Sequence, residues 1–383
     1  MKILRIIHSA NPKIGGPING IINSSKFISR DGHKVTHISL DAPADVSGID
    51  LPGEFIALGP SKSGYGFCPN LDQWLTKNLP RFDAVLVHGI WQYHGFAVWR
   101  HCRRLGKTAP PYYVYTHGML DPWFKRTYPL KHLKKWLYWP WGEYRILRDA
   151  KAVLFTSEKE KILARKSFWL YRAHERVIGY GTQRPEFSQE QYQAEWSKLC
   201  PAKQGARYWL YLGRLHEKKG ADLLINAYRA LKSIRKSLPD LILAGPEQDT
   251  RFTDQLKQMA ADDPQIHFVG MLSGAAKWGA LANADAMVLP SHQENFGIVV
   301  AEAMAMSTPV LISNKVNIWR EIEQAKAGIV ANDDLSGTQE LLSQFLELDQ
   351  GQRSEMSRAA QKCYEDHFSM ERATHDLIQF LQA

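Results

Sequence analysis

The sequence predicts an α/β protein in which two doubly wound domains follow one another along the chain. Its 383 residues are too many for one ordinary domain and sufficient for two. Short apolar runs that end in polar residues alternate with helix-like spacers, which is the pattern of parallel βαβ units. The same alternation begins again in the second half of the chain, and we therefore expect a second sheet there.

The first half contains a series of apolar runs that we expect to form strands. Between the first two runs, a helix is expected from about Pro17 to Ser29, and Asp31-Gly32-His33 forms a turn. The expected strands of this half are Lys2–His8, Lys34–Leu40, Ala84–Val87, Tyr112–Thr116 and Ala152–Thr156.

The second half repeats this plan. Helices are expected at Ala221–Ser237 and Gly274–Asn283, and the tail from Gln352 to Ala383 is also helix-like. The expected strands are Tyr208–Leu212, Leu241–Ala244, His267–Val269, Ala286–Leu289 and Pro309–Ile312.

Glycines and a proline between the two halves indicate a hinge within Val177–Ser188. We expect an N-terminal Rossmann-like domain over residues 1–182 and a C-terminal Rossmann-like domain over residues 183–365. Residues 366–383 are expected to form a helix that packs back on the N-terminal domain. Because ligands of open α/β sheets lie beyond the carboxyl ends of the strands, two domains that face each other would hold a ligand in the cleft between them.

The composition is that of a globular protein, with 44% hydrophobic and 23% charged residues. The chain lacks both a membrane-spanning apolar run and the pattern of a signal peptide at its start. Four cysteines lie far apart without a CxxC pair, which argues against disulfides and zinc sites and fits a reducing cytosol. The net charge of +9 favours an anionic partner, although a solvated basic surface without a partner is the alternative.

The stretch Tyr211–Leu224, YLGRLHEKKGADLL, places two cations beside the start of a helix. Arg214 follows the end of an expected strand, and Lys219 directly precedes the helix. Fixed cations and unpaired helical N–H groups are what a diphosphate requires. A basic surface loop with a glycine turn is the alternative interpretation.

Gly15 and Gly16 lie between the first strand and the first helix, where glycine lets a phosphate approach the backbone closely. The loop is not a GxGxxG motif, and Asp41 is the acidic residue nearest to the end of the second strand. A nicotinamide cofactor is therefore not indicated. A simple tight turn is the alternative.

The stretch Ser291–Ser313, SHQENFGIVVAEAMAMSTPVLIS, carries two carboxylates in apolar surroundings. Glu294 is expected in the loop after a strand, and Glu302 on the next helix, where an unpaired buried charge is costly. The first N–H groups of that helix lie between them and have no partner inside the helix. Carboxylates and N–H groups together suit a ligand rich in hydroxyls and oxygens. A partly exposed Glu302 on an amphipathic helix is the alternative.

The motifs ENFGIVVAE, GRLHEKKG and TPVLIS, together with the Gly-Gly loop and an internal His-Gly upstream of them, resemble the retaining GT-B glycosyltransferases of family 4. The resemblance extends over nearly the whole chain and is most specific in the second half. It implies a GT-B fold in which the N-terminal domain binds the acceptor. The C-terminal domain would bind a nucleotide-diphosphate sugar.

The resemblance also implies roles for single residues. Arg214 and Lys219 match the residues that bind the diphosphate. Glu294 matches the glutamate that contacts the donor sugar, and Glu302 matches the one that holds the ribose. The other matching positions are Gly15 and Gly16 in a loop that closes on the diphosphate, the backbone of Asn295, Phe296, Gly297 and Ile298 around sugar and phosphate, His117 near the transferred sugar, and Val269, Gly270 and Met271 near the base.

The hinge departs from the pattern of the family. Many members carry a Pro-Asn-Gly-Val-Asp-like sequence, whereas this chain reads IGYGTQRPEF over Ile178–Phe187. The glycine is present and the acid is not. The resemblance therefore assigns no role to the hinge.

The chemistry that the resemblance implies is consistent with the residues present. Departure of the diphosphate leaves positive charge on the sugar and negative charge on the leaving group. Arg214, Lys219 and helix N-termini would stabilise the leaving charge, and the sequence has no DxD triplet. We therefore expect no metal and no cofactor, with the nucleotide sugar as co-substrate. His117 would steady the sugar, or it is a strand-end histidine bonded to its neighbours.

We assign catalytic roles to His117, Glu294, Arg214 and Lys219. A glycosidase with two carboxylates is the rival interpretation of the two glutamates. Under the resemblance, however, Glu302 binds ribose at a distance from the reacting carbon. Retention would then follow from same-face attack, with a donor phosphate oxygen accepting the proton of the acceptor.

The segment 123–148 combines basic and aromatic residues in a pattern typical of a bilayer interface. Each basic residue near an anionic surface contributes about 1 kcal/mol to binding. A packed helix with a solvated basic face is the alternative, and no motif for nucleic-acid binding accompanies the segment. Its basic residues are Lys125, Arg126, Lys131, Lys134, Lys135, Arg145 and Arg148, and the interleaved aromatics are Trp123, Trp136, Tyr138, Trp139 and Trp141.

These features predict a metal-independent, retaining hexosyltransferase with a UDP- or GDP-type sugar donor and a glycan or lipid-linked acceptor. Its expected pathway is the synthesis of a cell-surface polysaccharide or glycolipid, and its expected place is the cytoplasm, peripheral on the inner face of the membrane. The alternatives are a sugar phosphorylase or nucleotide-sugar epimerase of the same fold, and a non-catalytic scaffold on a membrane surface.

Overall fold

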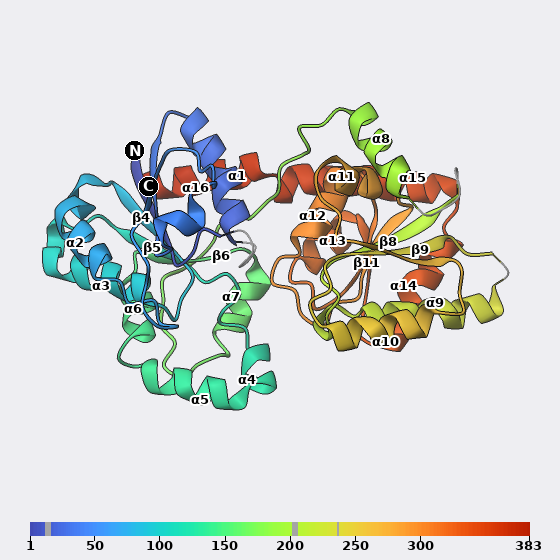
Figure 1. Ribbon diagram of the computed structural model, residues 1–383, viewed down its shortest axis with the longest axis horizontal. Coiled ribbons are helices and arrows are strands. Elements are labelled where there is room, and N and C mark those ends of the chain that lie inside the picture. The colour runs from blue at the N-terminus through green and yellow to red at the C-terminus, as the bar shows by residue number, and fades with distance from the viewer. Residues whose placement is uncertain (12–16, 201–205, 236) are drawn as a thin grey trace. The chain divides into compact units, whose positions relative to one another are not determined.

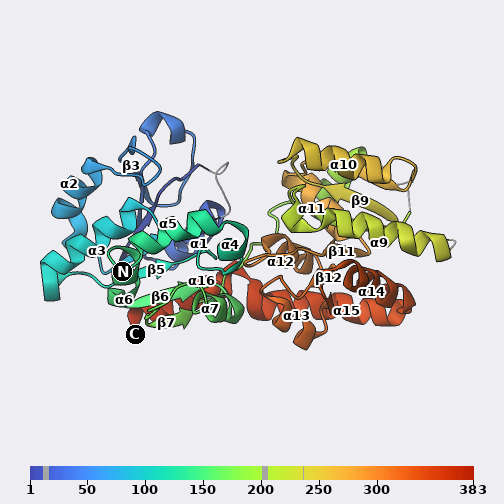
Figure 2. The same cartoon turned by 90° about the horizontal axis from the view of Figure 1, so that it is seen from below.

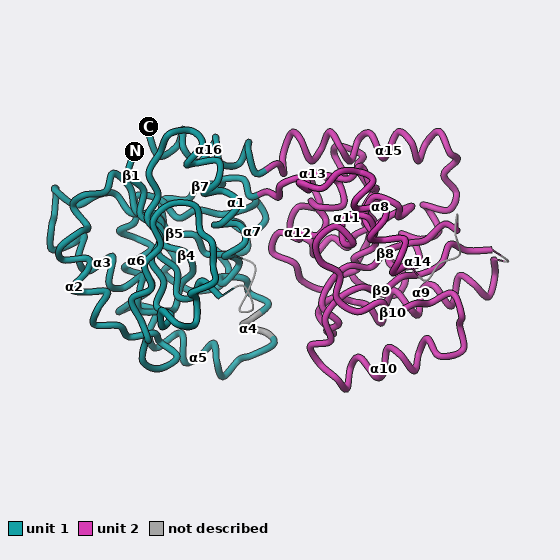
Figure 3. The backbone as a smooth tube through the Cα atoms, turned by 45° about the horizontal axis from the view of Figure 1, so that its top comes forward, with its two compact units in different colours: residues 1–180, 370–383 teal, residues 181–369 magenta. Residues whose placement is uncertain are grey.

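Apolar strands form two parallel sheets in the computed structural model, and helices cover both faces of each sheet (Figure 1). The structure describes residues 1–11, 17–200, 206–235 and 237–383. It divides into two compact units, which Figure 3 shows in different colours. Unit 1 comprises residues 1–180 and 370–383, and unit 2 comprises residues 181–369.

Over the described residues, unit 1 contains a seven-stranded sheet in the order β3-β2-β1-β4-β5-β6-β7. Its strands are β1 (Lys2–Ile7), β2 (Lys34–Ser39), β3 (Glu54–Ala57), β4 (Ala84–His88), β5 (Tyr112–Tyr115), β6 (Ala152–Phe155) and β7 (Glu175–Val177). Its helices are α1 (Pro17–Arg30), α2 (Pro69–Asn78), α3 (Tyr93–Leu105), α4 (Trp123–Thr127), α5 (Pro129–Tyr138), α6 (Glu143–Asp149), α7 (Glu158–Ala164) and α16 (Met370–Gln382).

Alternate side chains of each central strand enter cores on opposite faces of the first sheet, as the pleat requires. On β1, Leu4 and Ile6 belong to the core that also contains Trp99, whereas Ile3 belongs to the core on the other face. Strands that are buried on both faces have continuous apolar sequences, which is why these strands are recognisable in the sequence.

Helix α16 brings the end of the chain back to unit 1, where it packs against α1 (Figure 2). Its residues Leu377 and Leu381 lie in the same core as Ile3. The chain passes between the two units at 180/181 and at 369/370, whereas the sequence predicts domain boundaries at 182/183 and 365/366.

Unit 2 contains, within the described residues, a six-stranded parallel sheet in the order β10-β9-β8-β11-β12-β13. Its strands are β8 (Tyr208–Leu212), β9 (Asp240–Ala244), β10 (Ile266–Gly270), β11 (Ala286–Leu289), β12 (Val310–Ser313) and β13 (Gly328–Ala331). Its helices are α8 (Gln189–Leu199), α9 (Ala221–Ile234), α10 (Thr250–Ala260), α11 (Gly274–Asn283), α12 (Ile298–Ala305), α13 (Trp319–Ala325), α14 (Leu335–Glu347) and α15 (Gln350–Cys363).

Three strands are absent from the sequence prediction, namely β3, β7 and β13. All three lie at sheet edges, and most of their residues are only partly buried. An edge strand has a neighbour on one side only, so its sequence does not need the continuous apolar run by which central strands are recognised.

The helix-like tail consists of two helices with a break between them. Helix α15 continues into a wide π-type turn at Tyr364–Phe368, and Ser369 then separates it from α16. The Thr182 N–H donates a hydrogen bond to the carbonyl oxygen of Phe368 (3.0 Å), and the Tyr364 hydroxyl donates one to the carbonyl oxygen of Thr182 (2.9 Å). The two connections between the units therefore lie side by side within unit 2.

No helix among the described residues is both long enough and apolar enough to cross a membrane.

Candidate functional site

The loop after β8 carries the two cations that the sequence predicts for a diphosphate. Arg214 is exposed, and its Nη1 donates a hydrogen bond to Gln248 Oε1 (3.0 Å). Lys219 ends a 3₁₀ turn, and Gly220 adopts a left-handed conformation (φ 69°) immediately before α9. A Cβ atom at residue 220 would lie 2.3 Å from the carbonyl oxygen of Pro290. Glycine at this position therefore allows the loop to lie directly against the loop after β11.

The loop after β11 presents Glu294 to Lys219. The Lys219 ammonium group and the Glu294 carboxylate form an ion pair, and their side chains are 11% and 20% exposed. The Glu294 N–H donates to the carbonyl oxygen of Lys315 (3.0 Å), and the Glu294 carbonyl oxygen accepts from the N–H of Asn317 (3.0 Å). The fold thus brings together two of the predicted site residues and holds one of them by its backbone.

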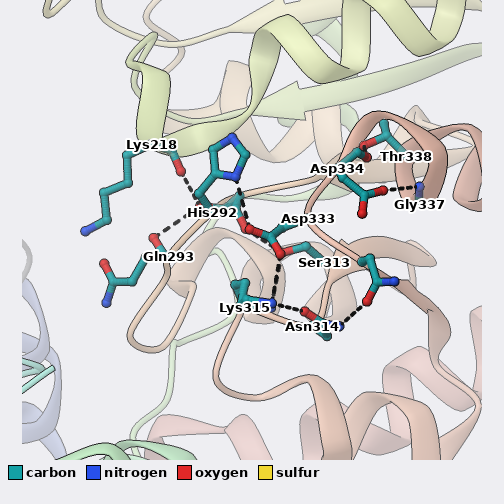
Figure 4. A network of polar contacts seen from close by, with 12 residues as sticks. Lys218, His292, Gln293, Ser313, Asn314, Lys315, Asp333, Asp334, Gly337 and Thr338 are labelled. Carbon is teal, nitrogen blue, oxygen red and sulfur yellow. Dashed lines mark hydrogen bonds and ion pairs between the residues drawn. The ribbon is translucent and has the colours of Figure 1, made fainter. Parts of the chain in front are cut away.

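A polar network beside Glu294 joins the loops at the carboxyl ends of four strands (Figure 4). Asp333 lies 3.1 Å from His292 Nδ1 and 2.8 Å from Lys315 Nζ. Burial alone would raise the pKa of Asp333, but hydrogen bonds from Lys315 and His292 hold it below its usual range. The His292 N–H donates to the carbonyl oxygen of Lys218 (2.9 Å), which ties the β8 loop to the same network.

Helix α12 begins at the site with a left-handed glycine, Gly297 (φ 77°). Phe296 is buried, and its ring packs edge-on against the ring of Phe368 at 5.7 Å between centroids. Ile298, the first residue of the helix, is 38% exposed, and Asn295 is half-buried. The first N–H groups of a helix lack helical acceptors and carry partial positive charge, so this helix start is suited to anionic oxygens.

Glu302 has a partner that the sequence does not indicate. It is 8% exposed on α12, and its Oε1 accepts a hydrogen bond from Lys277 Nζ of α11 (2.7 Å). The Lys277 ammonium group also lies 4.5 Å from the ring centroid of Trp278. The buried charge of Glu302 is therefore compensated within unit 2, and the alternative of a partly exposed Glu302 is wrong.

The segment matched to the nucleotide base lies at the other end of the sheet. Strand β10 contains Val269 and ends at Gly270, which has a left-handed conformation (φ 69°), and Met271 is 71% exposed directly after it. β10 is one of the two edge strands of this sheet, and β9 separates it from β8. The assignment of the base to this segment stays a prediction.

His117 follows β5 in unit 1 and has an unusual backbone conformation for a residue with a side chain (φ 47°). His117 Nε2 lies 3.1 Å from His88 Nδ1, and the two rings are stacked with 5.4 Å between centroids. Burial, together with the charge of Arg5, lowers the pKa of His117 to about 4. The imidazole is therefore neutral at pH 7 and is able to donate one hydrogen bond and accept another.

The remaining predictions concern the glycine loop and the absence of a metal. Gly15 and Gly16 lie outside the residues that the structure describes. In the described part of the chain, no three His, Cys, Asp or Glu side chains form a group that could hold a metal ion.

Like His117, Trp91 has a left-handed backbone and lies beyond the carboxyl end of a strand in the first sheet. This position was not identified from the sequence. Trp91, in the loop after β4, has a φ of 73°, and its N–H donates to Glu143 Oε2 (2.9 Å). Glu143 is 1% exposed, and burial raises its pKa to about 8. Strained residues gather at functional sites, and both Trp91 and His117 closely follow strands of this sheet. The signal in the sequence was a lone glutamate among aromatic residues, YWPWGEY.

The basic aromatic segment folds into α4, α5 and α6, and α5 leaves an apolar surface uncovered. Leu130, Leu133 and Leu137 are 82%, 60% and 74% exposed, and Trp141 beyond the helix end is 68% exposed. Their spacing of three and four residues places the leucines on one side of the helix. We call these four residues the α5 apolar face.

Trp139 is the fully buried aromatic residue among the five interleaved aromatics of this segment. Trp139 is 1% exposed and stacks on Phe168, so that it belongs to the core, as the packed-helix alternative requires. Lys131 and Lys134 are exposed beside the α5 apolar face, whereas Lys135 is half-buried with its ammonium group 4.8 Å from the ring centroid of Trp91. The side chain of Arg126 lies outside the described part.

Two family models match the chain. The model described as "Glycosyl transferases group 1" matches residues 193–363, and the model described as "Glycosyl transferase 4-like domain" matches residues 26–181. Together they leave only the two ends and a short connection unmatched.

Among curated relatives, the chain is 32% identical over 120 residues to an uncharacterized glycosyltransferase of Methanocaldococcus jannaschii. This match covers 31% of this chain and 30% of the relative. The chain is also 34% identical over 133 residues to the glycogen synthase of Mycobacterium tuberculosis. This match covers 33% of this chain and 31% of the relative. The chain thus spans about a third of the length of these curated relatives.

Among solved structures, the sucrose-phosphate synthase of Thermosynechococcus elongatus superposes with a TM-score of 0.75 at 18% identity and covers 100% of this chain and 98% of that one. The Anabaena protein HepE in complex with UDP and glucose gives a TM-score of 0.74 at 18% identity, with coverage of 100% and 99%. Likeness at this level of identity establishes a shared fold over the whole chain.

Proposed function

The chain belongs to the group 1 glycosyl transferases, and we propose that it is a retaining hexosyltransferase that takes its sugar from a UDP- or GDP-sugar. The two matching family models confirm the resemblance seen in the motifs. The matching structures confirm the predicted GT-B fold class. The observation that carries the proposal is the contact between Lys219 and Glu294 beside the left-handed start of α12 at Gly297.

The donor diphosphate would bind between the β8 loop and the start of α12. Lys219, Arg214 and the first N–H groups of α12 supply positive charge from two directions. Binding is expected to separate Lys219 from Glu294, because the diphosphate attracts the ammonium group while sugar hydroxyls donate to the carboxylate. The polar network around Asp333 would keep the Glu294 loop in place during this exchange.

The ribose would bind at Glu302. Among the described residues, Lys277 contacts Oε1 of this carboxylate, which leaves Oε2 to accept a ribose hydroxyl. A buried carboxylate that is held by a lysine is suited to binding and poorly suited to donating a proton. A glycosidase needs one of its two carboxyl groups to donate a proton, so the lysine-bound Glu302 favours a transferase.

In the proposed reaction, the bond between the anomeric carbon and the donor phosphate oxygen breaks, and the leaving diphosphate takes the bonding electron pair. The acceptor hydroxyl oxygen forms a new bond to the same face of that carbon, and its proton passes to a phosphate oxygen of the diphosphate. Arg214, Lys219 and the α12 start stabilise the negative charge that develops on the diphosphate. Neutral His117, in unit 1, would accept a hydrogen bond from a sugar hydroxyl.

Nucleotide binding tests the assigned roles. We expect one of UDP, GDP and ADP to raise the melting temperature of the protein, since a ligand at 100 times its Kd stabilises by about 2.7 kcal/mol. UDP is the first to test, because HepE was solved with UDP. Glu302→Ala should abolish most of this shift, whereas Glu294→Ala should keep the shift and slow transfer.

The matched control is Glu323→Ala, which changes a glutamate of the same unit on α13, outside the proposed site. It should leave both the nucleotide shift and the transfer rate unchanged. A nucleotide shift that survives in the Glu302→Ala protein would remove the ribose assignment.

We further propose that the acceptor is a glycan carried on a lipid at an anionic membrane surface, which fits the synthesis of a cell-surface polysaccharide or glycolipid. The α5 apolar face supports this, because its exposed leucines and Trp141 are flanked by the exposed Lys131 and Lys134. An apolar helix side with lysines beside it suits the boundary between headgroups and acyl chains. The expected location is therefore the cytoplasmic side of the membrane.

The alternatives make different predictions for the same protein. A nucleotide-sugar epimerase or a scaffold would release no nucleoside diphosphate in response to an acceptor, and a phosphorylase would consume inorganic phosphate. The paired Lys219 and Glu294 and the buried Glu302 favour a working donor site over a scaffold.

A further inference from the structure

A small cavity lies inside unit 1, between β1, α1, β4, β5 and α16. Its volume is about 20 Å³, and the polar side chains that line it are Arg5, Ser24, His88, Tyr115, His117, Tyr180 and Thr374. A cavity of this size accommodates one water molecule or one small ion. All lining residues belong to unit 1.

Arg5 brings a positive charge into this cavity without a negative partner. It is 4% exposed, and its Nη1 donates to Ile21 O (3.2 Å), Ser24 Oγ (2.8 Å) and Ser25 Oγ (2.7 Å). All three acceptors are neutral. Among the described residues, which include every Asp and Glu of the chain, none forms an ion pair with Arg5, and its buried Nε has no hydrogen-bond partner. An uncompensated buried charge costs several kcal/mol.

Two further buried groups that line the cavity also lack partners within the described chain. His88 is 4% exposed and Thr374 is 1% exposed, and neither His88 Nε2 nor Thr374 Oγ1 has a hydrogen-bond partner. A buried polar atom without a partner destabilises the fold, so several such atoms around one cavity indicate a missing ligand.

Arg5 and Thr374 are able to donate into the cavity, and His88 donates as well in one of its two neutral tautomers. Burial, together with the charge of Arg5, keeps the pKa of His88 well below its usual range, so the ring carries a single proton. In the tautomer in which His117 Nε2 donates to His88 Nδ1 (3.1 Å), Nδ1 of His88 is the acceptor. The single proton of the His88 ring then lies on Nε2. The guanidinium group is always a donor, and the hydroxyl of Thr374 is able to donate.

We propose that this cavity binds one small monovalent inorganic anion of the halide class. A buried cation without a negative partner, surrounded by groups that are able to donate, matches an anion. Phosphate and sulfate are too large for a cavity of about 20 Å³. The anion would compensate Arg5 and connect β1 to α16, so it would fasten the C-terminal helix to unit 1.

Thermal unfolding of the full chain tests this proposal without reference to sugar transfer. At matched ionic strength, chloride and bromide should raise the melting temperature by about 2–4 °C relative to gluconate, and the effect should saturate with halide concentration. The same melting temperature in halide and gluconate would overturn the proposal.

Thr374→Val removes one donor from the cavity at nearly constant volume, and it should reduce the halide shift. Thr253→Val is the matched control, because Thr253 is also buried with an unpartnered hydroxyl but lies on α10 of unit 2. It should keep the full halide shift. Equal halide shifts in both variants would contradict the assignment of the site.

Crystals soaked in bromide give an independent readout for the unaltered protein. An anomalous peak between Arg5, His88 and Thr374 is expected. Electron density for a water molecule at this place, without an anomalous signal, would overturn the proposal.

Discussion

The carboxylate of Glu302 is buried on α12 and pairs with Lys277 of the preceding helix. In the sequence, the apolar neighbours of Glu302 indicate that the charge needs a partner, but the lysine lies 25 positions earlier, before a strand. Only the packing of α11 against α12 brings them together. The need for a partner was therefore predictable from the sequence, whereas its identity depended on the tertiary structure.

Other single residues of the site show the same limit. Lys219 and Glu294 were recognisable because each belongs to a motif, and the structure places them in contact. His292, Lys315 and Asp333 belong to no motif, and they meet because three parallel strands end at one edge of a sheet. Sequence spacing does not reveal such contacts across strands.

Glu143 gives a prediction at the scale of one residue. Burial raises its pKa to about 8 from an ordinary value of 4.5, although the Trp91 N–H and Lys135 act in the opposite direction. Between these two pH values the folded protein binds more protons at this site than the unfolded chain does. The free energy of unfolding should therefore fall as the pH rises through this window, by up to about 1.4 kcal/mol per pH unit.

Glu143→Gln should remove this part of the pH dependence while keeping a side-chain oxygen for the Trp91 N–H. Urea unfolding at a series of pH values from about 5 to about 8, the window in which the two pKa values differ, measures the effect. Glu158→Gln, on the exposed side of α7, is the control. If the Glu143→Gln protein and the control have the same slope against pH, then Glu143 is not a buried neutral acid.

At the scale of elements, the central strands and the helices next to them follow from their sequences. The strand β8 and the helix α11 have the residue bounds that the sequence predicts. All of β8 is buried, and α11 buries one side. The edge strands β3, β7 and β13 were missed, since the pairing that forms them depends on a neighbouring strand. The tail was predicted as helical, but its break at Ser369 was not, because the break serves contacts with Thr182.

Helix α5 gives a prediction at the scale of one element. The α5 apolar face should insert at the surface of an anionic bilayer, with Lys131 and Lys134 at the headgroups. Lys131/Lys134→Glu should reduce binding to vesicles that contain an anionic lipid, because each basic residue contributes about 1 kcal/mol there. Leu133→Ser/Leu137→Ser should reduce binding in a manner that is less sensitive to salt.

The control for charge is Arg104/Lys107→Glu, which makes the same change on exposed residues at the end of α3. This protein should bind vesicles as the unaltered protein does. Sedimentation with vesicles of phosphatidylserine and phosphatidylcholine measures all three variants. Unchanged binding of the Lys131/Lys134→Glu protein would refute membrane docking through α5.

At the scale of the whole molecule, two parallel sheets present loops at the carboxyl ends of their strands. Unit 2 gathers Lys219, Glu294 and the start of α12 there, while unit 1 places His117 and Trp91 at the corresponding edge of its own sheet. The two-domain class was predictable because the alternation of strands and helices occurs twice in the sequence. The division of roles between donor and acceptor units follows from the resemblance and stays a prediction.

Product analysis of a complete reaction tests the central claim most directly. The protein is incubated with a UDP- or GDP-sugar of known anomeric configuration and a lipid-linked acceptor, and released nucleoside diphosphate and the new linkage are measured together. The account predicts release that depends on the acceptor, and a product with the anomeric configuration of the donor. A product of inverted configuration, or no acceptor-dependent release with either donor type, would contradict it.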